Sequence, residues 1–155
     1  MPELPRKKVG LVSCSGEEMA EGTVTRLATL KVLEELRPDK TVTICLPLFL
    51  AGGEEERTFA RFYPTITIDG CEKRCAAKGT ERYSSKPAVS IVVTESCDAA
   101  SCGLGSARHL NDAGRFAVTK VAGEIALKVD RLLEDAWKKP RRTSVDPFPI
   151  IQEGS

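Results

Sequence analysis

The chain has 155 residues, of which 41% are hydrophobic and 29% charged, and its formal net charge is +1. These values are typical of one soluble domain with a real core, and the near-neutral charge excludes a strong field toward nucleic acid or an anionic membrane. The apolar run that follows the charged N-terminus is too short for a signal peptide or a membrane span. We therefore predict a cytoplasmic protein with no nucleic acid and no membrane among its partners.

Strand-like and helix-like segments alternate along the chain. β-branched and apolar runs predict strands over residues 8–12, 41–46, 65–68 and 88–94. Apolar residues at helical spacing predict a helix over 23–36, with Thr23 as its N-cap. A second helix is expected over 54–62, because three glutamates at its start suit the positive end of the helix dipole.

Two further helices are predicted, a short one from about residue 71 to 79 and a long one over 111–138. The long helix should bury one face, made of Val118, Val121, Ala122, Ile125, Val129, Leu132, Leu133 and Ala136. Residues 140–155 contain three prolines and show no periodicity. They are expected to form a flexible or surface-draped C-terminal tail.

The alternation of strands and helices predicts an α/β fold with right-handed crossovers. We expect residues 1–139 to form a single three-layer domain, with a mostly parallel four-stranded sheet and the long C-terminal helix. The order of the strands cannot be read from the sequence.

Five of the six cysteines follow predicted strands or lie close to their ends. Cys14, Cys71 and Cys97 each come after one strand, Cys45 closes another, and Cys75 lies one helical turn past Cys71. The carboxyl ends of parallel strands meet at one edge of a sheet, so these sulfurs should converge there. In a reducing compartment such cysteines serve metal binding or redox chemistry more often than disulfides.

Cys71 and Cys75 form the tightest pair in the sequence. On a helix this spacing places both sulfurs on one face, close enough to share an ion. Cys71 would also lie at the helix N-terminus, where free amides and the dipole favour the thiolate. Asp69 could cap this helix or hold a ligand in position. Such a pair can also be simple packing, but Cys14 and Cys45, expected at the same edge of the sheet, favour metal or redox use.

Other residues could complete the site. Glu17 lies in a Gly- and Glu-rich turn that could supply a carboxylate, and Cys97 and Cys102 flank a loop of small residues. The two loop cysteines could join the site, form a redox pair of their own, or be buried small residues. His109 is expected at the surface or at a helix entry. No C-x-x-C motif occurs, which argues against a thioredoxin-type active site.

Residues 66–76 carry a family resemblance. The run Asp-Gly-Cys-Glu-Lys-Arg-Cys at residues 69–75 resembles the signature of the small prokaryotic DGC proteins, generally described as zinc-binding with four characteristic cysteines. Residues 12–16 and the stretch from Cys45 to residue 55 are similar to the family's first two cysteine elements, so the resemblance covers roughly residues 9–94.

This resemblance implies a Zn²⁺ site built from Cys14, Cys45, Cys71 and Cys75. Some members of the family carry a second cysteine three residues after the first, at the place of Glu17. This leaves Glu17 or Cys97 as substitutes for Cys45.

Three functions follow from these residues. The first is a zinc-binding protein whose site is structural or used in metal handling. The second is a thiol redox or sulfur-transfer enzyme, with Cys71 as nucleophile and Cys75 or Cys97 resolving the intermediate. The third is an iron–sulfur electron-transfer protein, because four thiolates suit either zinc or a cluster. No acid–base set, substrate or protein partner can be named, so whether the chain is an enzyme stays open.

Overall fold

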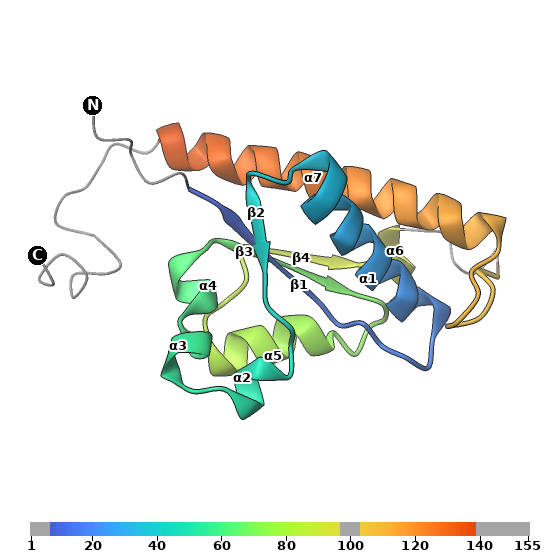
Figure 1. Ribbon diagram of the computed structural model, residues 1–155, viewed down its shortest axis with the longest axis horizontal. Helices are drawn as coiled ribbons and strands as arrows, with labels where there is room; N and C mark the ends of the chain where they lie inside the picture. The colour runs from blue at the N-terminus through green and yellow to red at the C-terminus, as the bar shows by residue number, and fades with distance from the viewer. Residues whose placement is uncertain (1–6, 97–102, 139–155) are drawn as a thin grey trace, which may run out of the picture.

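A four-stranded parallel sheet forms the centre of the molecule (Figure 1). The computed structural model describes residues 7–96 and 103–138. Its strands lie in the order β2-β1-β3-β4, and they are β1 Val9–Ser13, β2 Thr41–Thr43, β3 Thr65–Asp69 and β4 Val89–Val92. All three strand pairings are parallel, which confirms the predicted α/β class.

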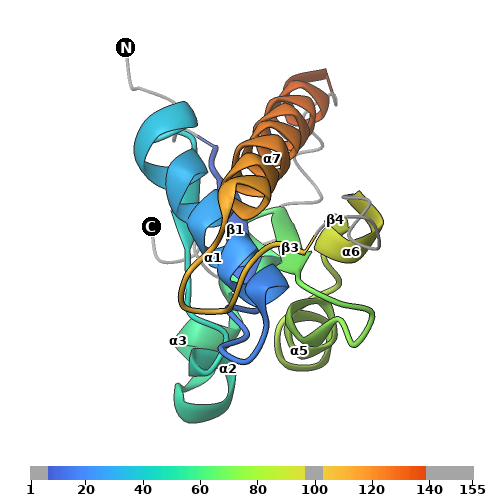
Figure 2. The same ribbon diagram turned by 90° about the vertical axis from the view of Figure 1, so that its right-hand side faces the viewer.

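Helices cover both faces of this sheet. They are α1 Ala20–Lys31, η1 Val32–Leu36 (a π-helical turn), α2 Leu48–Ala51, α3 Glu54–Arg57, α4 Phe59–Phe62, α5 Cys75–Tyr83, α6 Val93–Ser96 and α7 Asp112–Lys138. Figure 2 shows α1 and α7 on one face and α2, α3 and α5 on the other. The three-layer arrangement is therefore the one expected from the sequence.

The face under α1 and α7 holds the larger core. Side chains alternate along a strand, so β1 and β3 each direct every second residue to this face, namely Val9, Leu11, Ile66 and Ile68. They pack with α1 and with the buried stripe of α7, in which Val121, Ala122, Ile125 and Val129 are fully buried. The predicted inner face of the long helix is thus confirmed.

The opposite face has a much smaller cluster. Its fully buried members are Val12, Phe49 and Ala76. Five half-buried residues pack around them, namely Cys14, Ile44, Leu46, Phe59 and Tyr83. The buried hydroxyls of Thr67 in β3 and Thr80 in α5 have no hydrogen-bond partner among the described residues. The layer of α1 and α7 has one such hydroxyl among the described residues, that of Thr29 in α1. The layer of α2–α5 is therefore thinner and has one more unpartnered hydroxyl.

Several predicted helix boundaries are wrong. The first helix begins at Ala20, so Thr23 lies inside it and donates its hydroxyl proton to the carbonyl of Ala107. The helix expected over 54–62 is split at Thr58 into α3 and α4. The segment 48–51, which the sequence analysis left without an element, forms α2.

Two strands are shorter than predicted. β2 is an edge strand that pairs only with β1 and ends at Thr43, because a turn closed by the Leu48 N–H on the Cys45 carbonyl follows it (3.0 Å). β4 ends at Val92, where α6 begins. The predicted tail over residues 140–155 lies outside the described residues. None of the described helices combines the length and apolarity needed to cross a membrane.

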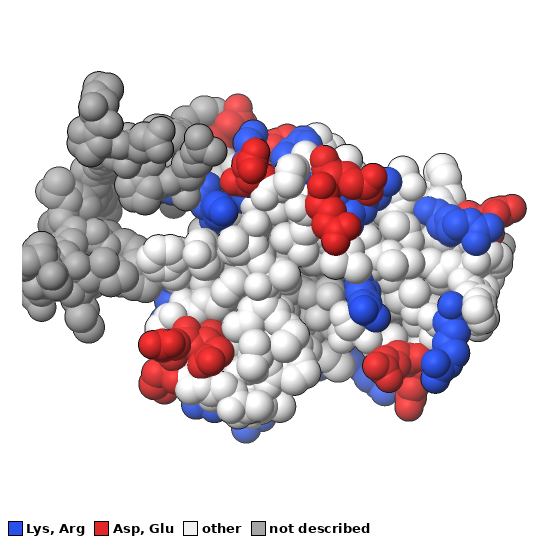
Figure 3. Space-filling model, viewed as in Figure 1, with Lys and Arg blue, Asp and Glu red and all other residues white. Residues whose placement is uncertain are grey.

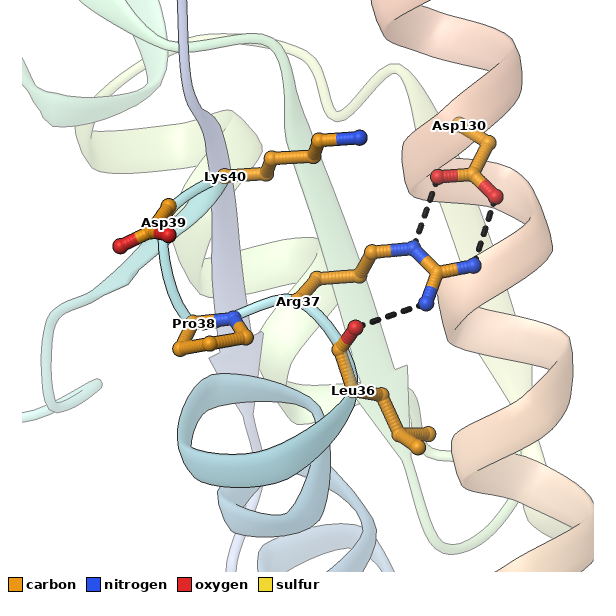
Figure 4. A pocket seen from close by; sticks show the side chains of 6 residues that line it. All are labelled: Leu36, Arg37, Pro38, Asp39, Lys40 and Asp130. Atoms are coloured by element: carbon orange, nitrogen blue, oxygen red, sulfur yellow. Dashed lines mark hydrogen bonds and ion pairs between the residues drawn. The ribbon is translucent and has the colours of Figure 1, made fainter.

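An ion pair fastens α7 at the amino-terminal end of the sheet (Figure 4). Arg37, which directly follows η1, donates from Nε to Asp130 Oδ1 (2.8 Å) and from Nη2 to Asp130 Oδ2 (2.7 Å). These hydrogen bonds from Arg37 hold the pKa of Asp130 below its ordinary value, with a further contribution from Lys40. The pair borders an open hollow that Pro38 and Asp39 also line.

Candidate functional site

The candidate site lies at the carboxyl ends of β1 and β3. These strands are neighbours, yet the chain leaves β1 toward α1 on one face and leaves β3 toward α5 on the other. Such a switch point opens a crevice between the two departing loops, and it is where doubly wound folds bind their ligands. Cys14 directly follows β1, and Cys71 follows β3 by two residues.

The two strand ends are in direct contact through a sulfur atom. The backbone N–H of Gly70 donates to Cys14 Sγ (3.3 Å), and the N–H of Cys14 donates to the Ile68 carbonyl (2.9 Å). The Cys14 sulfur therefore contacts the residue that immediately precedes Cys71. The hydroxyl of Thr25 in α1 lies 3.6 Å from the same sulfur. The predicted meeting of these two distant cysteine segments is confirmed at this point.

Glycines allow this close approach. A Cβ atom at Gly22 would lie 2.1 Å from the Gly16 carbonyl oxygen, and one at Gly70 would lie 2.9 Å from the Gly22 nitrogen. The turns after β1 and β3 therefore touch backbone to backbone. The Gly70 position is also 3.2 Å from Cβ of Glu21, which places this half-buried carboxylate residue beside the turn that carries Cys71.

The segment between Cys71 and Cys75 differs from the prediction. Residues 71–74 form a turn in which the Arg74 N–H donates to the Cys71 carbonyl (3.1 Å), and α5 begins only at Cys75. The expected helical spacing of the two sulfurs on one face is therefore wrong. Cys71 is half-buried in the turn, and Cys75 is exposed at the first position of the helix.

Asp69 explains where α5 begins. Its carboxylate accepts from the N–H groups of Ala76 (2.6 Å) and Ala77 (3.1 Å), so it caps the helix from the end of β3. The residue is 1% exposed. Burial raises the pKa of Asp69, while the two N–H bonds and the charges of Arg74 and Lys78 oppose that rise. Of the two roles considered for Asp69, the cap is the one that its contacts describe.

The other candidate ligands are more dispersed. Cys45 is exposed in the turn after β2, and its neighbour Leu46 lies 3.0 Å from the Cβ position of Gly79 in α5. Glu17 and His109 are exposed, and Cys97 and Cys102 lie outside the described residues. In the part of the chain that is described, no three Cys, His, Asp or Glu side chains gather closely enough to hold a metal ion. The four described cysteines are all free thiols.

Backbone strain marks the same place. Within residues 7–96 and 103–138, the non-glycine residues with positive φ are Ser15 (50°) and Arg74 (52°). One follows Cys14 and the other precedes Cys75. Left-handed backbone costs energy for residues with a side chain, and it persists where a site requires a particular chain path.

Sequence reasoning missed two residues of this site. Thr25 accepts a hydrogen bond from the Ser15 N–H (3.2 Å) and donates to the Gly22 carbonyl (2.6 Å), so it holds the turn around Cys14. Its signal is a threonine on the mainly apolar buried side of α1, which Thr29 shares. Glu21 was hidden because the start of α1 was placed three residues too late.

Comparison with known proteins agrees with this geometry. The family model described as the DGC domain matches residues 10–103, more than half of the chain and all of the switch point between β1 and β3. No curated protein and no solved structure matches the chain. On the strength of that match, and of the Asp-Gly-Cys run that leaves β3, the chain belongs to the DGC domain family.

Proposed function

We propose that this chain is a metal-binding protein that holds one zinc ion through Cys14, Cys45, Cys71 and Cys75. The role of the ion would be structural or in metal handling. The observation that carries this proposal is the contact between the Gly70 N–H and Cys14 Sγ, because it joins two candidate ligand segments that lie far apart in the sequence. Family membership supports the same site.

The donor chemistry fits zinc. Four thiolates are a preferred tetrahedral ligand set for Zn²⁺, and the four cysteines are unpaired. An N–H donor to a ligand sulfur fixes its orientation and offsets part of its negative charge, as neighbours of metal ligands commonly do. For Cys14 that donor is already in place.

The ligands are not assembled in advance, so binding would be coupled to local ordering. Cys45 and Cys75 are exposed, and their side chains can reorient without unpacking the core. Glu17 stays a candidate substitute for Cys45, and Glu21 is a second oxygen donor beside the turn of Cys71. A complete set of four thiolates would leave no open position for water, which favours a non-catalytic ion.

The thiol-enzyme alternative loses its main physical argument. It required helix-end amides around Cys71, but α5 begins four residues later and its first amides are bonded to the carboxylate of Asp69. No contact among the described residues favours an iron–sulfur cluster over zinc.

Elemental analysis of protein purified without chelator tests the proposal. We expect one zinc per chain, and loss of most of that zinc in Cys71→Ser and Cys75→Ser. Cys97→Ser and Cys102→Ser should keep their zinc, since these cysteines are outside the proposed ligand set, and loss of zinc in Cys97→Ser would instead identify Cys97 as the substitute for Cys45. Removal of the ion should also lower thermal stability strongly, because structural zinc contributes on the order of 10 kcal/mol.

Full zinc content in both Cys71→Ser and Cys75→Ser would overturn the proposed ligand set. Visible absorption after anaerobic reconstitution with iron and sulfide, together with no affinity for zinc, would assign the site to a cluster instead. Circular dichroism of each variant separates the loss of a ligand from the loss of the fold.

A further inference from the structure

The surface beside Cys75 carries unpaired positive charge. Residues 71–86 contain five cations against two carboxylates, Glu72 and Glu81. The cations are Lys73, Arg74, Lys78, Arg82 and Lys86, all exposed. The ion pairs among the described residues involve other side chains, namely Lys31–Glu35, Arg37–Asp130 and Arg115–Asp112. These five charges are therefore not neutralised by salt bridges within the described structure.

Helical geometry places several of them around the exposed thiol. The side of α5 that faces the sheet is made of Ala76, Ala77 and Thr80. Residues three, four and seven positions apart share a face of a helix. Lys78 and Arg82 therefore lie on the outer face that begins with Cys75. We call this surface, Cys75 with Lys73, Arg74, Lys78 and Arg82, the α5 cationic face.

The positive charge is held close to the start of the helix. Arg74 is fixed by its left-handed backbone and by a hydrogen bond from Nη2 to Ser90 Oγ (2.7 Å). Acidic side chains gather elsewhere, over α3 at the lower left of Figure 3, where Glu54 and Glu55 are exposed. Three successive glutamates thus begin α3, whereas cations outnumber carboxylates by five to two over residues 71–86.

Cys45 provides an internal comparison. It is also an exposed thiol, but no charged residue occurs in the sequence between Lys40 and Glu54. The sequence neighbours of Cys45 are therefore uncharged, whereas those of Cys75 are cationic.

We propose that the α5 cationic face docks small, negatively charged zinc complexes, in which carboxylates hold the metal, and delivers them to Cys75. This inference rests on the proposed zinc function and names the form in which the metal arrives. A surface of one charge sign raises the local concentration of opposite ions and their association rate, by about tenfold or more at low salt. As the ion passes to the cysteines, Zn–O bonds to the carboxylates break, Zn–S bonds form, and the thiol protons go to the released carboxylates or to water, so no redox change is involved.

Thiol labelling tests the docking surface on the metal-free protein. Two methanethiosulfonate reagents of similar size are compared, one with a sulfonate and one with a trimethylammonium group, and labelling of each cysteine is followed by peptide mass spectrometry. We expect the ratio of anionic to cationic labelling rates to be about tenfold higher at Cys75 than at Cys45 at low salt. The difference should vanish near 1 M salt, where charges are screened within about 3 Å. Equal ratios at both thiols would overturn the proposal.

Charge reversal then identifies the residues responsible. Lys78→Glu with Arg82→Glu should bring the ratio at Cys75 down to that at Cys45. Lys120→Glu with Arg131→Glu makes the same charge change on exposed positions of α7, on the opposite face of the sheet, and should leave the ratio unchanged. Equal effects of the two double variants would mean that net charge, not the α5 cationic face, sets the selectivity.

Zinc transfer tests the ligand class. Uptake from zinc nitrilotriacetate, an anionic complex, should slow several-fold in Lys78→Glu/Arg82→Glu, whereas uptake from aquated Zn²⁺ should not, and the final stoichiometry should stay the same. Anion-selective labelling with unchanged uptake from the complex would overturn the small-complex proposal and point to an acidic protein partner. Protein that binds no zinc from either source would refute the proposed function, while the labelling ratios would still decide whether the face selects anions.

Discussion

The two faces of the sheet are built very differently. On the α1 and α7 face, long helices cover a continuous core in which both helices and three strands take part. On the α2–α5 face, short helices cover a cluster with only three fully buried apolar side chains, Val12, Phe49 and Ala76. Two buried threonine hydroxyls of this second layer have no partner among the described residues. The α1 and α7 face is therefore densely packed, and the α2–α5 face is thinly packed.

Three of the described cysteines lie on or beside the thin face. Cys14 packs against the cluster of Phe49, Leu46 flanks Cys45, and Cys75 opens α5. Regions with few buried apolar contacts open locally at low free energy, and ligand sites are commonly drawn from them. We therefore expect the α1 and α7 face to hold the ends of β1 and β3 in place, while the thin face allows the cysteine segments to move when zinc binds.

The largest expected effect comes from emptying each core in turn. Phe49→Ala and Ile125→Ala should each cost about 3 kcal/mol of unfolding free energy, because both side chains are fully buried. The location of the loss should differ. Hydrogen exchange should show faster opening of the α2 and α5 amides in Phe49→Ala, and faster exchange throughout the sheet in Ile125→Ala.

Zinc affinity sharpens this contrast. Phe49→Ala should weaken zinc binding, since Cys14 packs against the same cluster, and zinc should recover part of the lost stability. Uniform exchange across both layers in Phe49→Ala would show that the two faces open as one unit, which would contradict the difference in local stability proposed here.

The next effect concerns the cap that connects β3 to the thin face. Asp69→Ala should destabilise the protein by about 2 kcal/mol, because it leaves the N–H groups of Ala76 and Ala77 without their acceptor. Asp69→Asn is the matched control, since it keeps one oxygen acceptor and should cost less. Urea unfolding followed by circular dichroism measures both. Identical losses would mean that the negative charge, not the acceptors, is what matters.

The smallest effect is expected at the opposite end of the sheet. Asp130→Asn should cost about 1 kcal/mol near neutral pH, a modest value because both partners are partly exposed to solvent. The pKa of Asp130 is lowered in the folded protein. Its ion pair therefore stabilises the fold above the ordinary pKa of the carboxyl group, and this contribution disappears as the pH falls through the lowered value.

Unfolding curves recorded from neutral to acidic pH check this prediction. The difference between the wild-type protein and Asp130→Asn should shrink as the solution becomes acidic. Glu134→Gln, an exposed carboxylate of α7 outside the ion pairs described above, should show little difference at any pH. A gap that stays constant into strong acid would mean that the ion pair does not account for the stability.

The sequence predicted best where pattern and packing agree. The positions of the four strands follow their β-branched and apolar runs, and the inner face of α7 follows a helical periodicity that its 27 residues make unambiguous. The start of α5 was missed because its cap is not the preceding residue but Asp69, six residues before Cys75. The start of α1 was missed because Met19, its N-cap residue, makes no side-chain cap bond.

The candidate site was predictable only in outline. Parallel strands predicted that Cys14 and Cys71 would meet, and strand order later made β1 and β3 neighbours. The helical pairing of Cys71 with Cys75 failed, because residues 71–74 turn before the helix starts. The contact of Gly22 with Gly16 depends on three-dimensional packing that no spacing rule contains.

The position of α7 has a consequence for synthesis on the ribosome. The DGC domain match ends at residue 103, yet Val121, Ile125 and Val129 complete the larger core. When residue 103 emerges, all four strands and α1 are present, but the apolar face under α1 still lacks the part of its cover that α7 supplies. Translation must continue through α7 before that surface is shielded, and until then the growing polypeptide offers a binding surface to chaperones.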